Sequence, residues 1–267
     1  MEEFEHSKVV SQIITTLQSE DINSQTAAAE ASGIIKDKRY EKIIQKIIKD
    51  VDDEQLLETL LFSIGSNKFT SLTSYICSNL KNPKMNKQSF SALTSIKTGC
   101  EPEIKEILKS TELKERMTAL EYITKTQNKA FKDDVIAIFK NDKGGILFSA
   151  SLALLSMDEK DGADYVMNYF NNEITDNNLK YKNLKSLNEL IKDDNQSIIA
   201  ILKDNIKSTS FKIKLFCSIT IVLRGKINEL SQEEVEFIED NKDTDDTSLI
   251  PIIAKYNVYM KKQKNKK

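Results

Sequence analysis

A short apolar block that closes on lysine, asparagine or aspartate recurs along the chain at a nearly constant interval, and this interval limits the fold more than any other feature. The blocks are IITTLQSED, IIQKIIKD, YICSNLKN, EIKEILKS, VIAIFKND, VMNYFNNE, IIAILKDN and VEFIEDNK. Their last apolar residues lie 31, 32, 28, 31, 31, 32 and 36 residues apart, at Leu17, Ile48, Leu80, Leu108, Phe139, Phe170, Leu202 and Ile238. Such a period indicates a stack of similar structural repeats.

Each repeat is expected to be a helical hairpin. Within a block the apolar residues keep helical spacing, as Ile44, Ile47 and Ile48 do. A second apolar pattern follows each block, as in DEQLLETLLFSIG and GILFSASLALL. A helix A followed by a helix B therefore fills each period, and the chain holds about eight such pairs. The chain has only 7 Gly and 3 Pro, too few for the many turns of an all-β protein. We therefore predict an all-α fold.

Two segments, SQTAAAEASGIIKD and IIKDVDDEQLLETLLFSIG, resemble HEAT repeats of the short bacterial and archaeal type. The resemblance is good from Leu17 to Gly65 and reduces to periodicity beyond Cys100. It also has a departure, because Gln25 stands where the repeat usually has arginine near the start of helix B. The resemblance implies a right-handed α-α superhelix, a HEAT-like or armadillo-like solenoid. Its A helices would line the convex face and its B helices the concave face, where partners usually bind.

The domain organisation follows from the unbroken period. We expect one solenoid domain over residues 1–260 and a disordered basic tail, KKQKNKK, over residues 261–267. Glycines near the ends of the B helices are expected to cap them in the left-handed conformation, at Gly33, Gly65, Gly99 and Gly225.

The chain offers few residues for chemistry, so we predict that it is not an enzyme and has no catalytic residues, metal site or cofactor. His6 is the sole histidine, which is too few for a zinc site of the usual kind. Acidic pairs fall near expected helix ends, where capping explains them, at Asp52-Asp53, Asp133-Asp134, Asp193-Asp194 and Asp245-Asp246. The three cysteines, Cys77, Cys100 and Cys217, are expected to be reduced packing residues, although Cys100 could be a regulatory thiol.

Charge is distributed unevenly along the chain. Residues 1–60 have 7 basic and 13 acidic residues, whereas residues 61–150 have 14 and 9. The motif LKYK at 179–182 recurs as FKIK at 211–214, one repeat later. Helical spacing places Lys182 and Lys214 outside the core, side by side on neighbouring B helices. The predicted partner-binding set adds three further basic residues to this pair, and it is Lys182, Lys214, Arg116, Lys180 and Lys212.

These features favour a cytoplasmic, monomeric, non-catalytic scaffold that binds another protein, one with an acidic surface, on its B-helix face. The alternative is a nucleic-acid-binding protein resembling the HEAT-like alkylpurine DNA glycosylases. That alternative is disfavoured because the net charge is −2 and the chain has no Trp. A lyase subunit that attaches a bilin pigment shares only the repeat type. The longest apolar run, ILFSASLALLSM, is too short to span a membrane.

Overall fold

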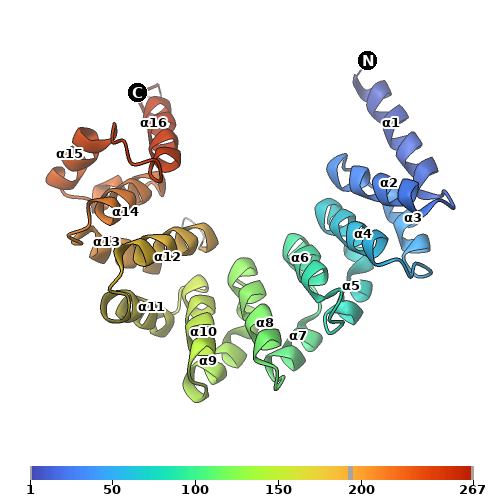
Figure 1. Ribbon diagram of the computed structural model, residues 1–267, viewed down its shortest axis with the longest axis horizontal. Coiled ribbons are helices and arrows are strands. Elements are labelled where there is room, and N and C mark those ends of the chain that lie inside the picture. Colours follow the sequence, from blue (N-terminus) through green and yellow to red (C-terminus); the bar gives the residue numbers. More distant parts are fainter. Residues whose placement is uncertain (1, 192–194, 266–267) are drawn as a thin grey trace. The chain divides into compact units, whose positions relative to one another are not determined.

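The computed structural model describes residues 2–191 and 195–265, apart from the side chains of residues 2–4 and 173. Within these ranges the chain forms sixteen α-helices and no strand, which confirms the predicted all-α solenoid class (Figure 1). The odd-numbered helices are the A helices: α1 (Glu2–Leu17), α3 (Tyr40–Ile47), α5 (Thr73–Asn79), α7 (Glu101–Leu108), α9 (Lys132–Asn141), α11 (Lys160–Asn168), α13 (Gln196–Ile206) and α15 (Gln232–Asn241).

The even-numbered helices are the B helices: α2 (Ile22–Ile34), α4 (Glu54–Asn67), α6 (Asn86–Ile96), α8 (Leu113–Thr126), α10 (Gly145–Ser156), α12 (Asn177–Leu190), α14 (Phe211–Leu223) and α16 (Ile250–Lys264). Four short helical turns lie between them: η1 (Thr70–Leu72), η2 (Lys129–Phe131), η3 (Tyr169–Glu173) and η4 (Ile227–Glu229). The expected eight hairpins are therefore present. The longest interval between repeat blocks, of 36 residues, contains the long connection 224–231 between α14 and α15, which includes η4.

Side-chain caps fix where several B helices begin. The carboxylates of Asp21, Asp53 and Asp176 each accept a hydrogen bond from the backbone N–H three residues later, at 2.9, 2.8 and 2.6 Å. These bonds satisfy amide groups that have no partner within the helix. Asp53, which belongs to the acidic pair Asp52-Asp53, therefore has a structural role as a helix cap. The pair Asp193-Asp194 lies outside the described residues.

The chain divides into two compact units, residues 1–134 and residues 135–267. In the first unit the consecutive B helices α2, α4, α6 and α8 pack against one another. Small polar side chains join α2 to α4, because the Ser32 and Ser63 hydroxyls lie 2.7 Å apart and both are buried. The Asn67 amide adds a hydrogen bond to the Ser32 carbonyl at 2.8 Å. Short side chains therefore let the B helices approach closely.

The expected capping role is wrong for three of the four glycines. Gly33 and Gly65 lie inside α2 and α4, and the left-handed residue that follows α4 is Lys68, with φ 58°. A Cβ on Gly65 would lie 2.8 Å from the Ala92 Cα of α6, so this glycine permits close helix packing instead. Gly99 has a φ of 96°, but the left-handed residue that caps α6 is Lys97, with φ 69°. Gly225 has a φ of 72°, and its N–H donates to the Val222 carbonyl at the end of α14, as expected.

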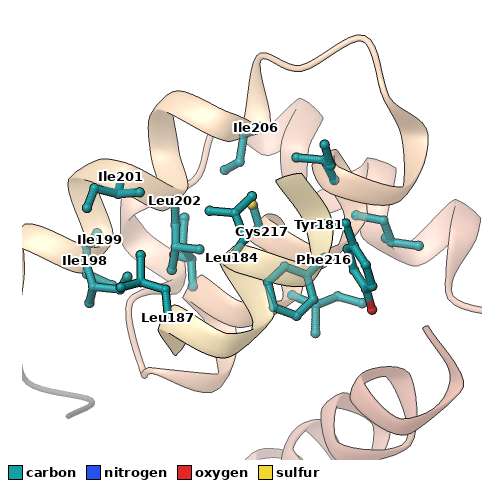
Figure 2. Packing of buried hydrophobic residues seen from close by; sticks show 14 of the residues in the cluster. Tyr181, Leu184, Leu187, Ile198, Ile199, Ile201, Leu202, Ile206, Phe216 and Cys217 are labelled. Carbon is teal, nitrogen blue, oxygen red and sulfur yellow. The ribbon is translucent and has the colours of Figure 1, made fainter. Parts of the chain in front are cut away.

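The second unit has a core built mainly from α12, α13 and α14 (Figure 2). Tyr181 of α12 packs edge-on against Phe216 of α14, with ring centroids 5.2 Å apart. Leu184 and Cys217 are fully buried nearby. The apolar faces of the hairpins thus close against their neighbours, as a repeat fold requires.

The last helix, α16, continues through Lys264 into the segment expected to be a disordered tail. Its final turn contains Lys261, Lys262 and Lys264, cations that suit a helix C-terminus. Among the residues that the structure describes, no helix is long and apolar enough to cross a membrane.

Candidate functional site: the basic edge of α12 and α14

The motifs LKYK and FKIK lie one repeat of 32 residues apart, near the start of α12 and α14, two B helices in contact. Leu179 and Phe211 are exposed by 49% and 41%, whereas Tyr181 and Ile213 are buried. The two motifs therefore share one pattern of burial. The pattern places an apolar residue and lysines at the surface of both helices, and we call this surface the basic edge.

Three of the lysines differ in how they lie on the basic edge. Lys182 is exposed, as predicted. The Lys214 ammonium instead lies 4.2 Å from the centre of the Phe237 ring of α15, and Lys214 is only half-exposed. The Lys212 ammonium lies 4.4 Å from the centre of the Tyr181 ring. Cation–π contacts of this kind hold a charge in place while leaving part of it open to solvent.

Aromatic and acidic neighbours complete the basic edge. The Phe211 and Phe237 rings lie 5.9 Å apart, edge to face. The Tyr181 hydroxyl donates a hydrogen bond to the Ser248 carbonyl at 3.0 Å. The pKa of Asp246 is lowered by a hydrogen bond from the Ser248 hydroxyl and, to a smaller extent, by the charge of Lys212. Lys212 is therefore partly balanced by an acid of its own chain.

The remaining predicted binding residues are Lys180 and Arg116. Lys180 is half-exposed and belongs to the same motif as Lys182. Arg116 belongs to α8 in the first unit, and its Nε donates a hydrogen bond to the Leu108 carbonyl at the end of α7, at 3.0 Å. Gln25 does the same in the first hairpin, where its Nε2 donates to the Leu17 carbonyl at 2.9 Å. Gln25 thus replaces the expected arginine in closing the end of an A helix.

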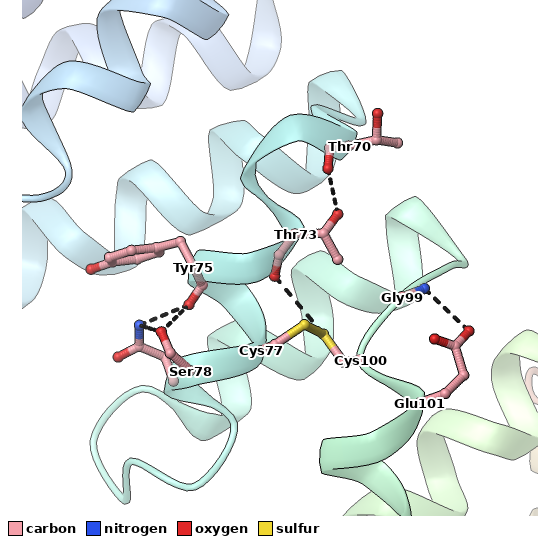
Figure 3. The surroundings of a disulfide bond; sticks show 9 residues. Thr70, Thr73, Tyr75, Cys77, Ser78, Gly99, Cys100 and Glu101 are labelled. Carbon is pink, nitrogen blue, oxygen red and sulfur yellow. Dashed lines mark hydrogen bonds between the residues drawn. A yellow bond between two sulfur atoms is a disulfide. The ribbon is translucent and has the colours of Figure 1, made fainter.

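The expectation of three reduced cysteines is wrong. Cys77 of α5 and Cys100, just before α7, form a disulfide with Cα atoms 5.2 Å apart (Figure 3). The fold brings together two residues 23 positions apart in sequence, because α5 and α7 are A helices of successive hairpins. Cys217 remains free and fully buried, and burial raises the pKa of its thiol.

Glu103 lies close enough to both disulfide sulfurs for the three side chains to meet at one metal ion. Metal binding by cysteine requires thiolates, and the disulfide has none. His6 lies at the surface, with its Nε2 3.5 Å from the Asp37 carboxylate. Asp134 of another acidic pair lies 3.4 Å from the Lys105 ammonium. The two disulfide sulfurs, His6 and Asp134 therefore each have a partner within the first unit.

Sequence reasoning missed the apolar half of the basic edge. Leu179 and Phe211 are the first letters of the two quoted motifs, and both fall outside the apolar stripe of their helices. An apolar residue outside the buried stripe of its helix is visible in the sequence, and it could have indicated an apolar surface group at both positions. Phe237 carried no such signal, because its contact with Lys214 depends on how α15 packs.

No family model and no curated protein matches this sequence. Among solved structures, the complex of CpcE and CpcF of phycocyanin lyase from Nostoc sp. PCC7120 contains a similar chain. The two chains are 14% identical with a TM-score of 0.55, and the match covers 86% of this chain and 94% of that chain. This likeness shows that the two chains share a fold.

This likeness corrects the expectation that the chain is not an enzyme, because the protein that shares its fold is a lyase. The absence of catalytic motifs does not exclude an enzyme, for a physical reason. In a repeat fold, function resides in individual surface side chains rather than in a local sequence motif. The HEAT-repeat resemblance is supported in its coarser part, a fold of stacked helical hairpins.

Proposed function

We propose that this chain is a helical scaffold that binds another protein through its B-helix face, with the basic edge as one contact surface. The observation that carries the proposal is the repeated exposure of Leu179 and Phe211 beside lysines. Apolar groups next to fixed charges are typical of surfaces that a partner covers. The matching partner surface is acidic, with an apolar residue to meet Phe211.

The lysines at this edge contribute mainly to the rate and selectivity of association. Exposed charges steer an oppositely charged partner and are screened by salt. Lys182 is exposed to solvent, whereas Lys214 is positioned by the Phe237 ring. The apolar residues would then slow dissociation by burying surface on contact.

The experiment starts with affinity purification of the partner from the native cell. The pair Lys182→Glu with Lys214→Glu should leave the helical circular dichroism intact and weaken partner capture, more at low salt than at high salt. The matched control, Lys143→Glu with Lys160→Glu, makes the same charge change at two exposed lysines outside α12 and α14. Unchanged affinity of the first pair at low ionic strength would exclude the basic edge.

A second candidate function is a lyase activity exerted together with another subunit, and the likeness to the CpcE and CpcF complex favours it. Incubation of the chain and its captured partner with a bilin pigment and phycocyanin subunits tests this candidate. Pigment that becomes covalently attached only when both proteins are present would support it. The cytoplasmic location expected from sequence does not enter either proposal, because the Cys77–Cys100 disulfide is more typical of oxidising compartments.

A further inference from the structure

A groove of about 510 Å³ lies between the B helices α6 and α8 in the first unit, whereas the basic edge belongs to the second unit. Its walls are two helical faces. The residues that line it are Asn86, Lys87, Phe90, Ser91, Thr94 and Ser95 of α6, and Lys114, Thr118, Glu121, Tyr122 and Lys125 of α8. From Lys114 to Lys125 the groove follows α8 for about 16 Å, which is the length of roughly five extended residues.

The groove exists because the side chains at its centre are small. Ser91 and Thr118 occupy the positions that Lys182 and Lys214 occupy in the second unit, counted along the repeat. Below them, Phe90 and Tyr122 are buried with their rings 5.9 Å apart, so the floor is closed and aromatic. Burial raises the pKa of Tyr122 to about 12, so its phenol adds no negative charge.

The charge of the groove is positive. Lys87 and Lys114 are exposed, each at the second position of its helix, and neither forms an ion pair with the side chains that the structure describes. The one acid, Glu121, already pairs with Lys125 at 2.5 Å. The neighbouring α4–α6 surface is different, since Lys84 there pairs with Glu54 at 3.1 Å. Two equivalent lysines at helix N-termini, where the helix dipole is also positive, favour a bound anion.

The hydroxyls of the groove suit a peptide backbone. The Thr118 hydroxyl donates to the Lys114 carbonyl at 2.9 Å, and the Thr94 hydroxyl donates to the Phe90 carbonyl at 2.7 Å. With their hydrogens directed into their own helices, these oxygens offer lone pairs to a donor in the groove. The backbone N–H groups of an extended segment are such donors.

The geometry points to the α6–α8 groove as a docking site for an extended acidic segment of a partner protein, with carboxylates at Lys87 and Lys114 and backbone amides along the hydroxyls. This inference rests on the proposed protein-binding function and specifies a partner chemistry for it. The basic edge and the groove are separate surfaces, so each can be tested without the other.

The test uses the full-length protein and a short fluorescent peptide of alternating Glu and Ser, followed by fluorescence anisotropy at low salt. The pair Lys87→Gln with Lys114→Gln should weaken binding about tenfold, the size expected for two exposed ion pairs. A control pair, Lys46→Gln with Lys49→Gln, removes one exposed lysine of α3 and one just after it, and should bind like the native protein. A peptide of alternating Lys and Ser should not bind.

A second pair of variants fills the groove without changing its charge. Ser91→Leu with Thr118→Leu should abolish binding, whereas Ser11→Leu at an exposed serine of α1 should not. Circular dichroism verifies that each variant is folded. Equal binding by the native protein and both groove pairs, or no binding by the native protein, overturns the inference.

A single-stranded oligonucleotide that displaces the peptide at far lower concentration also overturns the inference, because it would show a site for nucleic acid. Partner capture by the native chain without any peptide binding would reject the groove and leave the proposed function standing. Peptide binding that depends on the groove, with no partner captured from cells, would support the groove and count against the basic edge.

Discussion

Arg224, at the end of α14, donates hydrogen bonds to the side-chain oxygen of Asn188 at 2.7 Å and to its carbonyl at 3.1 Å. A further bond from the same Arg224 nitrogen reaches the Ile191 carbonyl at 3.0 Å, and Arg224 is only 7% exposed. One guanidinium therefore satisfies the carbonyl end of α12 and joins two neighbouring repeats. A planar group with several donors is suited to this task, and a lysine ammonium is not.

Arg224→Met should lower the free energy of unfolding by about 2–4 kcal/mol, because it leaves buried carbonyl groups without donors. Denaturant unfolding followed by circular dichroism measures this change. Lys203→Met is the control, because Lys203 forms an exposed ion pair with Glu229 at 3.0 Å, and its loss should cost less than about 1 kcal/mol. Similar losses for the two variants would contradict the role given to Arg224.

Gly65→Ala should destabilise the first unit by about 1–3 kcal/mol, because the added methyl group meets the backbone of Ala92 and pushes α6 away from α4. Gly145→Ala is a matched control at the first residue of α10, where an added Cβ meets nothing within 4 Å. That substitution should be neutral or stabilising by up to about 1 kcal/mol. Thermal unfolding of both variants distinguishes the two cases, and a stabilising effect at Gly65 would refute the close packing.

Asp37 should make stability depend on pH at the acidic end. A hydrogen bond from the Arg39 guanidinium lowers the pKa of Asp37 from 3.8 to about 2. The stability that this pair contributes is therefore fully present above pH 3.8 and is lost as the pH falls through about 2.

Asp37→Asn should cost up to about 1 kcal/mol at neutral pH, since the partner Arg39 is largely exposed. The difference from the native protein should shrink as the pH is lowered toward 2. Asp52→Asn, at an exposed acid, serves as the control. A constant difference across the acidic range would show that Asp37 acts through its shape rather than its charge.

The disulfide can be tested by counting thiols. After denaturation without reductant, a maleimide should label one cysteine, Cys217, and after reduction it should label all three. Native protein should not be labelled, because Cys217 is fully buried. Cys77→Ser with Cys100→Ser should lower stability by about 3 kcal/mol, the value expected for closing a loop of this length. Three thiols in the unreduced protein would contradict the bond.

The period of the sequence predicted the hairpins because apolar spacing directly reports which face of a helix is buried. The same logic aligned LKYK with FKIK, and the two motifs share their burial pattern. Contacts between repeats were not predictable in this way. The contact of Lys214 with Phe237 and the pairing of Cys77 with Cys100 depend on how successive helices lie against each other.

The glycines illustrate the same limit. A glycine near a helix end suggests a cap, yet Gly65 lies within α4. A glycine fits there because the backbone of Ala92 leaves no room for a Cβ. Likewise, nothing but small size marks Ser91 and Thr118 in the sequence, whereas in the structure both line a groove. In each case the outcome depends on the space that a neighbouring repeat leaves, and a single sequence does not specify that space.

The Cys77–Cys100 disulfide also determines how the chain responds to force. A pull on the two ends of the molecule is carried across the sulfur–sulfur bond, so the residues between Cys77 and Cys100, which include α6, bear no load. That loop, which spans 23 positions in sequence, would otherwise lengthen by roughly 80 Å when extended. One wall of the groove, α6, therefore lies in a loop that the disulfide protects from force. Reduction of the disulfide allows a pulling force to extend this loop.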